Sequence, residues 1–199
     1  MKTPQVQSLV LFSIVATLGL GGDLWTKSVL FDWLGLPGTS DPYWLVDGVF
    51  GFQTAVNPGA MFGMGAGKGL LFAGFSIVAL LGIGFWLIRG GGMQNRKLSL
   101  VLGLISGGIL GNLYDRLGLW TGPFLDHPLY QSEYDSGVRD WILFRVEGVP
   151  LFDPWPNFNI ADACLVVGAI SLILLSFLTP VADNAGSSTS ESVDGQPNP

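Results

Sequence analysis

Four long runs of the sequence contain no charged residue, and they constrain the fold more than any other feature. The runs Thr3–Gly22, Gly69–Ile88 and Ala163–Ala182 hold 20 residues each, and Leu98–Tyr114 holds 17. About 20 mostly apolar residues allow a helix to cross the hydrocarbon core of a bilayer, and its backbone groups must be paired within the segment. Charged residues make up only 12% of the chain. The sequence therefore predicts an integral membrane protein with four transmembrane helices.

The expected fold class is an all-α membrane protein with a small extracytoplasmic β-rich cradle and an interfacial loop. One membrane domain is expected over residues 1–182, followed by a polar, disordered tail over 183–199. Its four spans are placed at about 4–22, 69–88, 98–118 and 160–179, and its outer segments at about 23–68 and 119–159. In the first outer segment, aromatic and β-branched residues alternate with turn formers and predict short strands. The second is rich in Trp, Tyr, Phe and Pro, which is typical of a loop at headgroup level.

The orientation follows from the short connector RGGGMQNRK, residues 89–97. It holds three of the nine Lys and Arg residues and no acid, and positive residues near span ends mark the cytoplasmic side. Both termini are therefore expected in the cytoplasm. Read alternatively as a cleaved secretory signal, the first run would need an A-x-A site, but ATLGLGGD offers none. A retained first span is favoured.

Two Asn-x-x-Asp motifs stand where the third span ends and the fourth begins, Asn112 to Asp115 and Asn159 to Asp162. Residues three apart share a helix face, so each Asn can hydrogen-bond the Asp it precedes. One outer segment joins the two spans, so both acids come to the same membrane face. Two such carboxylates can share a proton, activate a water and protonate a leaving group. This pattern predicts aspartic-type peptide hydrolysis.

A structural alternative exists for the same acids: each Asp could cap a helix end and pair with Arg116 or Lys27. Intramembrane acids are functional by default, and two matched motifs favour the functional interpretation. Gly107 and Gly111, with Gly108 beside them, form a small-x-x-x-small pattern that lets another backbone come close. The alternative is that glycine is simply common in membrane helices.

Five short motifs together resemble the lipoprotein signal peptidases, or signal peptidase II, of bacterial inner membranes. In chain order they are DLWTK (23–27), NPGAMFG (57–63), GNLYDR (111–116), VRDW (138–141) and FNIAD (158–162). The resemblance implies a multi-pass aspartic endopeptidase of the inner (cytoplasmic) membrane with its active site near the outer face. It would remove the signal peptide of prolipoproteins by cutting before a diacylglyceryl-modified Cys.

The resemblance also implies roles for individual residues. Asp115 and Asp162 would be the catalytic dyad. The residues implied in substrate binding or support are Asn57, Asn112, Arg116, Asn159, Asp23, Lys27, Gly59 and Asp140, with Ala60 and Phe62 shaping the loop around Gly59. No metal or cofactor is expected. The expected partners are lipidated prolipoproteins and membrane lipid, and the protein is expected to act as a monomer. Nucleic acid is not expected for a chain of net charge −6 without a basic cluster.

The sequence departs from the family pattern in places. Met61 replaces the small residue usual before the Phe, and Trp141 replaces a Phe. The 46 residues between Asp115 and Asp162 make an unusually long connection, and the insertion over about 124–147 has no assigned role.

Other membrane activities fit the sequence less well. A rhomboid-like serine protease needs Gly-x-Ser-Gly and a His on a span, but Leu104 and Ile105 precede Ser106, and the only His is His127 in an outer segment. The Gly-x-Gly-Asp motif of a presenilin-like protease is absent. A proton-coupled carrier would be expected to show an inverted repeat or broken helices. A scaffold leaves the two intramembrane acids unexplained.

Overall fold

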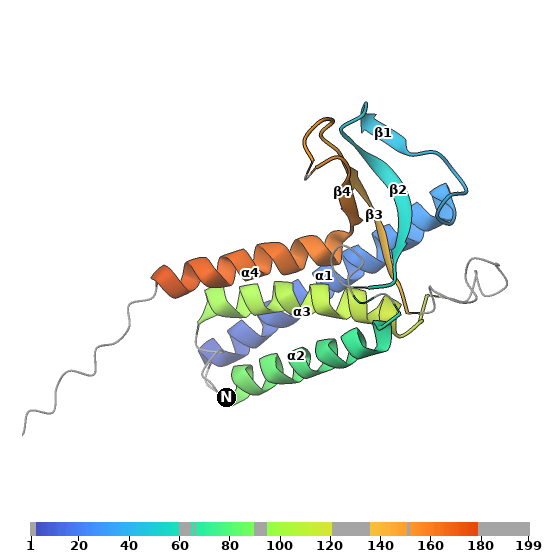
Figure 1. Cartoon of the computed structure of the whole chain (residues 1–199). Coiled ribbons are helices and arrows are strands. Elements are labelled where there is room, and N and C mark those ends of the chain that lie inside the picture. The colour runs from blue at the N-terminus through green and yellow to red at the C-terminus, as the bar shows by residue number, and fades with distance from the viewer. Residues whose placement is uncertain are drawn as a thin grey trace, which may run out of the picture.

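Four helices dominate the computed structural model, which describes residues 3–59, 65, 67–89, 95–120, 136–150 and 152–178 (Figure 1). They are α1 (Thr3–Leu34), α2 (Gly69–Arg89), α3 (Arg96–Arg116) and α4 (Ile160–Leu178). All four are long and apolar enough to cross a membrane. The four predicted helices are therefore confirmed. The tail over 183–199, Ala60, Phe62 and residues 124–135 of the insertion lie outside the described residues.

Helix α1 is longer than the sequence suggested. It contains 32 residues, so it measures about 48 Å at 1.5 Å per residue and exceeds a hydrocarbon core of about 30 Å. The helix continues past residue 22, where the first span was expected to end, and Asp23 and Lys27 lie within it. Their side chains form an i, i+4 ion pair of 2.7 Å and are fully buried. Paired in this way, the two charges do not end the helix.

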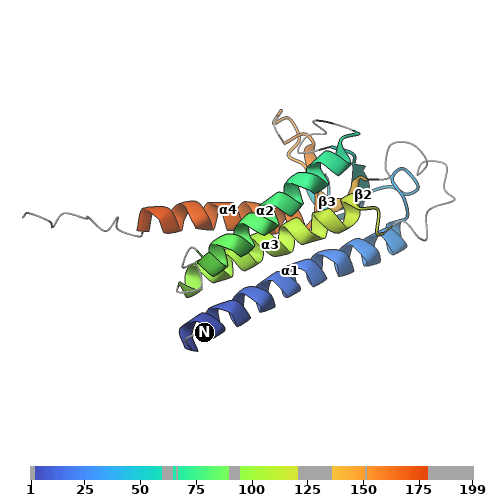
Figure 2. The same cartoon turned by 90° about the horizontal axis from the view of Figure 1, so that it is seen from below.

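Helix α3 is the centre of the bundle, and α1, α2 and α4 pack around it (Figure 2). Of its most apolar 18-residue window, 61% is buried, against 11% in each of the other three helices. Glycines permit this packing. A Cβ on Gly107 would approach the Ala16 carbonyl oxygen of α1 to 2.9 Å, and one on Gly108 would approach the Ala161 oxygen of α4 to 2.5 Å. The predicted close approach at these glycines is confirmed.

The segment between α1 and α2 and the segment between α3 and α4 join in one antiparallel sheet of order β1-β2-β3-β4. Its strands are β1 (Tyr43–Val46), β2 (Phe50–Asn57), β3 (Val138–Phe144) and β4 (Trp155–Phe158). The strands predicted in the first segment are confirmed. The second segment supplies β3 and β4 where a loop was expected, so the all-α class is wrong. Strand β3 is buried over Val138–Leu143 because it lies between β2 and β4 and packs on helices.

The sheet is fixed to the protruding end of α1 by an apolar cluster. Leu30, Phe31 and Leu34 of the helix pack with Trp141 and Ile142 of β3. The sheet therefore lies over the helix ends where α3 finishes and α4 begins (Figure 1). This junction of helices and sheet is where the two Asn-x-x-Asp motifs meet.

Candidate active site

The fourth helix begins with a reciprocal cap that fixes Asp162. The Asp162 N–H donates to Oδ1 of Asn159 at 2.9 Å, and the Asn159 N–H donates to Oδ2 of Asp162 at 3.2 Å. This is the hydrogen-bond pattern of a capping box. It holds the carboxylate at the N-terminus of α4, where the helix dipole favours negative charge. The predicted pairing of this Asn with its Asp is confirmed, with backbone N–H groups as the donors.

Asn112 on α3 bonds across to α4. Its side-chain amide donates to Oδ1 of Asp162 at 2.8 Å, and its Oδ1 accepts from Lys27 Nζ and from Asn159 Nδ2, both at 3.1 Å. The expectation that Asn112 bonds Asp115 on its own helix is wrong, because Asp115 turns to other partners. Asn112 therefore joins the two motifs to each other.

Asp115 lies in a buried ion-pair cluster. Its Oδ1 accepts from Arg139 Nε at 3.0 Å and Nη2 at 2.8 Å. Its Oδ2 accepts from the Arg139 backbone N–H at 3.0 Å and lies 3.0 Å from Lys27 Nζ. The side chain is fully buried and is not among the residues that line the adjacent pocket. The alternative interpretation, in which this acid pairs with Lys27, describes it better than a role in water activation.

Lys27 connects three helices through this cluster. Besides Asp115 and Asn112, its ammonium pairs with Asp23 on its own helix at 2.7 Å. Asp23 in turn accepts a hydrogen bond of 2.9 Å from the Ala161 N–H in the first turn of α4. The ammonium thus lies 2.7 Å from an Asp23 oxygen, 3.0 Å from an Asp115 oxygen and 3.1 Å from the Asn112 oxygen. These residues therefore lock α1, α3 and α4 together beneath the site.

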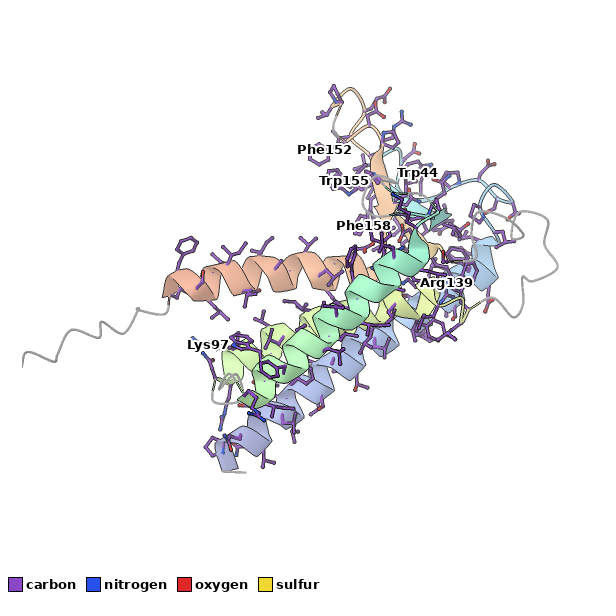
Figure 3. All side chains as sticks on the ribbon, turned by 60° about the horizontal axis from the view of Figure 1, so that its bottom comes forward. Trp44, Lys97, Arg139, Phe152, Trp155 and Phe158 are labelled. Carbon is purple, nitrogen blue, oxygen red and sulfur yellow. The ribbon has the colours of Figure 1, made fainter. Side chains whose placement is uncertain are left out.

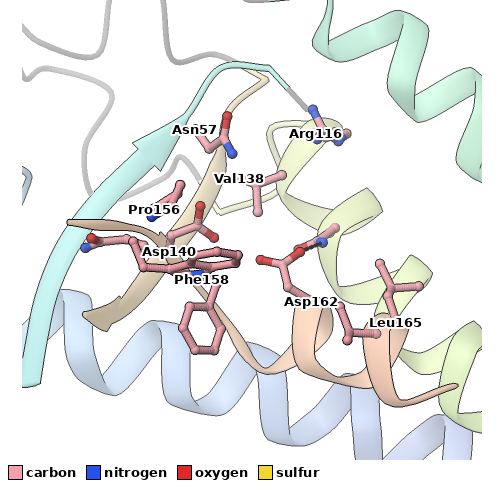
Figure 4. A pocket seen from close by; sticks show the side chains of 12 residues that line it. Asn57, Arg116, Val138, Asp140, Pro156, Phe158, Asp162 and Leu165 are labelled. Carbon is pink, nitrogen blue, oxygen red and sulfur yellow. Dashed lines mark hydrogen bonds between the residues drawn. The ribbon is translucent and has the colours of Figure 1, made fainter. Parts of the chain in front are cut away.

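Asp140, on strand β3, is the acid that meets Asp162. Both carboxylates line one pocket (Figure 4). Asp140 is 2% exposed and its Oδ1 accepts from Asn159 Nδ2 at 2.6 Å. Burial raises the pKa of Asp140 well above its usual range, and the charge of Asp162 raises it further. Two carboxyl groups sharing a site cannot both ionise readily, so the pair is suited to holding one proton.

The pocket has a volume of about 230 Å³. Its apolar walls come from strand β4 and helix α4, with one residue from β3. The residues are Trp155, Pro156, Phe158, Leu165, Val166 and Val138. The carboxylates thus face a cavity that is apolar over most of its wall.

Asn57 and Arg116 form the polar end of the pocket. Arg116 Nη2 donates to the Gly59 carbonyl oxygen at 2.9 Å, and its guanidinium lies 5.0 Å from the Phe72 ring centroid. The Gly59 N–H donates to Oδ1 of Asn57 at 3.0 Å. Nη1 of Arg116 is buried without a hydrogen-bond partner among the described residues.

The structure therefore brings nine of the ten predicted site residues, and one that was not predicted, into two adjoining groups with Gly59 at the edge. Arg139 was missed, although it stands inside the VRDW motif. A sequence cannot distinguish a buried Arg from a solvated one, and the only signal available was its position between Val138 and Asp140. The β4 wall was also missed, because residues 155–158 were assigned to a loop.

The sequence of this chain is similar to those of known proteins. Residues 15–178 match the family model described as signal peptidase (SPase) II. A lipoprotein signal peptidase of Rhodopirellula baltica is 50% identical over 167 residues, which cover 84% of this chain and 71% of that protein. One of Rhodococcus jostii is 30% identical over 173 residues, covering 86% and 75%.

Two solved structures share the fold. A bacterial membrane enzyme determined by the in meso method at 2.3 Å resolution aligns with a TM-score of 0.64 and 21% identity, covering 92% of this chain and 93% of that one. A second, at 1.9 Å resolution, aligns with a TM-score of 0.61 and 23% identity, covering 88% and 94%. The helices and the sheet thus form an arrangement known from bacterial membrane enzymes.

Proposed function

The chain belongs to the signal peptidase II family, and from this premise we propose that it removes signal peptides from bacterial prolipoproteins as an aspartic endopeptidase. The bond cut would be the one before the diacylglyceryl-modified Cys. The family implies a peptidase, and the four helices imply a multi-pass membrane protein. What the geometry adds is an assignment of the residues that carry out the reaction.

We assign the catalytic pair to Asp140 and Asp162, and no longer to Asp115 and Asp162. One observation carries this assignment: the two carboxylates line the same pocket, and Asn159 hydrogen-bonds to both. Asp115 has both oxygens occupied by Arg139 and Lys27. An acid held in this way has no free oxygen for a water or a substrate, so its role is structural.

The environments of the two acids differ. Asp140 is buried and its pKa is raised well above the usual range, which favours its protonated form and suits it to act as the general acid. Asp162 accepts hydrogen bonds from Asn112 and from the Asn159 backbone at a helix N-terminus, and these bonds fix its carboxylate at the pocket. We therefore assign Asp162 as the general base.

The reaction then proceeds without a covalent intermediate. A water in the pocket gives a proton to Asp162 as its oxygen attacks the scissile carbonyl, while Asp140 gives its proton to the carbonyl oxygen. In the second step the tetrahedral diol collapses, the C–N bond breaks, and the amine leaves with a proton from Asp162. The hydroxyl proton returns to Asp140. Water is consumed, and both carboxyls end as they began.

Two further groups would hold the peptide. Arg116 would offer Nη1, which has no hydrogen-bond partner in the described part of the chain, to a backbone carbonyl, and Asn57 lines the same end of the pocket. A guanidinium held by the Gly59 oxygen and the Phe72 ring is a preorganised donor. Positioning the peptide at this end would set the scissile bond between the two acids.

The apolar wall supports selectivity for lipidated substrates. Val166 lines the pocket and is 51% exposed, so the wall continues onto the outer surface of α4. Acyl chains attached to the substrate Cys could stay in the bilayer along this surface and hold the peptide at the depth of the pocket. An unlipidated precursor lacks this anchor and would be a poor substrate.

We propose that the protein lies in the bacterial inner membrane with both termini and the connector 89–97 in the cytoplasm. Lys97 lies at the opposite end of the bundle from Arg139 and the sheet (Figure 3). With Lys97 inside, the pocket faces outward. The peptidase domain would extend over residues 1–182 and act as a monomer.

The test uses purified protein in liposomes with diacylglyceryl prolipoprotein. Asp140→Asn and Asp162→Asn should each reduce kcat by about a thousandfold while the variants still insert and purify. Residual cleavage should be similar in both. Wild-type turnover by Asp140→Asn, together with a folded but inactive Asp115→Asn, would overturn the assignment and return Asp115 to the pair.

A further inference from the structure

Arg139 is a buried charge with no part in the reaction proposed above. Its side chain comes from strand β3 and is 4% exposed. Its guanidinium lies 5.0 Å from the Trp120 ring centroid and 5.9 Å from that of Phe31. Burying a charge is costly unless it is paired and hydrogen-bonded. The role of Arg139 therefore depends on the pairing that compensates this cost.

Its partner is the Asp115 carboxylate, which it binds in two ways. The side chain donates from Nε and Nη2 to one oxygen, and the backbone N–H donates to the other. A side-chain contact alone would leave the strand free to shift. The backbone hydrogen bond ties the main chain of β3 to α3, and Lys27 fixes Asp115 from α1.

The next residue along the strand is Asp140. Successive side chains of a strand point to opposite faces, so Arg139 reaches Asp115 while Asp140 faces the pocket. Asn159 Nδ2 bonds both the Arg139 carbonyl oxygen, at 3.2 Å, and the Asp140 carboxylate, at 2.6 Å. The carboxylate is thus located by the anchored main chain before it and by Asn159 beside it.

We propose that Arg139 is a positioning residue of the active site: by binding Asp115 through its backbone and its side chain, it holds β3 on α3 at the depth where Asp140 meets Asp162. This inference rests on the proposed function, since it requires Asp140 to take part in cleavage. Arg139 acts on the reaction through Asp140 and has no contact with the substrate.

Its charge has a second consequence. Among the described residues, charged groups on three helices act on Asp140. The cations are Lys27 of α1 and Arg116 of α3, and the acids are Asp115 of α3 and Asp162 of α4. Without Arg139, Asp115 is left to Lys27, which Asp23 also shares. The charge of Asp115 already contributes to the raised pKa of Asp140, so removing Arg139 should raise it more.

The experiment compares Arg139→Lys, Arg139→Gln and a matched control, Arg145→Gln, in the liposome assay with diacylglyceryl prolipoprotein. Arg145 follows the same strand, is exposed and pairs with Asp153 at 2.5 Å. Lys keeps the charge but loses the fork, so kcat should fall about tenfold with KM within about twofold and the pH profile unmoved. Gln should lower kcat about 100-fold and move the alkaline limb of the profile, where the general acid Asp140 loses its proton, to higher pH. Arg145→Gln should change none of these.

Three outcomes separate this inference from its premise. Suppose that Asp140→Asn is inactive, but Arg139→Lys and Arg139→Gln keep the kcat of the wild type and the alkaline limb of its pH profile. The positioning role is then overturned and the proposed function stands. If Asp140→Asn is active, the premise itself fails. If Arg139→Gln does not fold, as measured by thermal unfolding, Arg139→Lys decides: lower kcat at unchanged KM supports the role, and unchanged kcat ends it.

Discussion

The side-chain amide of Asn112 donates a hydrogen bond of 2.8 Å to Oδ1 of Asp162, which lies 50 positions further along the chain. This contact joins the end of α3 to the start of α4, and the Asn112 oxygen receives Lys27 and Asn159 on its other side. One amide thus connects the buried ion pairs around Asp115 to the acids in the pocket. The N–H₂ donor and the oxygen acceptor of Asn112 both have partners, so a substitution that replaces the donor with an acceptor should change the activity.

Asn112→Asp tests this contact. The substitution keeps the shape but replaces the N–H₂ donor with a carboxylate facing Asp162, and close like charges oppose each other. We expect kcat/KM to fall by at least about tenfold, equivalent to about 1.4 kcal/mol. The control is Asn95→Asp, the same change at the N-cap of α3, where either residue caps well. Equal kinetics for the two variants would show that the Asn112 donor is dispensable.

Asp140→Asn should stabilise the fold at neutral pH while it abolishes cleavage. Because the pKa of Asp140 is raised in the folded state, its carboxyl contributes stability below its unfolded pKa of about 3.9 that is lost as pH rises through the folded value. Asn does not ionise, so the loss is absent. We expect the Tm of the variant in detergent to exceed that of the wild type near pH 7 and the difference to shrink toward pH 4.

Asp153→Asn provides a control of opposite sign. The Gly148 N–H and then Arg145 lower the pKa of Asp153, so this group contributes stability above its unfolded pKa that is lost as pH falls through the folded value. Its variant should have an unchanged or slightly lower Tm near pH 7, converging with the wild type in acid. An Asp140→Asn variant that is less stable than the wild type near pH 7 would contradict the assigned environment of Asp140.

Gly111→Ala should disturb the site through the buried ion pair of Asp23 and Lys27. A Cβ at this position would meet the Asp23 carboxylate and come within 3.2 Å of the Ala161 Cβ. Overpacking of this kind costs about 1–3 kcal/mol, and here it would also displace the partner of Lys27. Gly74→Ala on α2 is the matched control, since a Cβ there meets nothing within 4 Å. We expect Gly111→Ala alone to lower both Tm and kcat; identical behaviour of the two variants would show that α1 and α3 can separate freely.

Arg116→Lys should weaken the hold on the substrate without unfolding the protein. The guanidinium uses Nη2 on the Gly59 oxygen and keeps Nη1 buried and unpartnered within the described residues, and an ammonium cannot reproduce that fork. We expect kcat/KM on lipidated prolipoprotein to fall about tenfold with Tm little changed. Arg96→Lys, at the other end of the same helix, should have no effect. Unchanged constants for Arg116→Lys would leave Arg116 as an anchor that only sets helix depth.

Much of the architecture could be predicted because hydrophobicity is a local property. The charge-free runs indicated all four helices, and the alternation within residues 41–63 indicated short strands where β1 and β2 lie. Glycines at 107, 108 and 111 predicted close helix approach. Strands β3 and β4 were not predicted, because β3 (VRDWILF) carries two charged residues without a clear alternation and becomes a strand by pairing with β2, which lies more than 80 positions earlier in the chain.

The identity of the acid facing Asp162 was the point that only the tertiary structure decided. By itself the sequence determined that two Asn-x-x-Asp motifs stand at adjoining helix ends, and repetition made Asp115 the natural second acid. Folding instead brings Arg139 and Lys27 onto Asp115 and turns Asp140 toward the pocket. The ionisation of a buried carboxyl depends on which cations and donors surround it, and these partners come from distant parts of the chain. Spacing along the sequence carries no record of them.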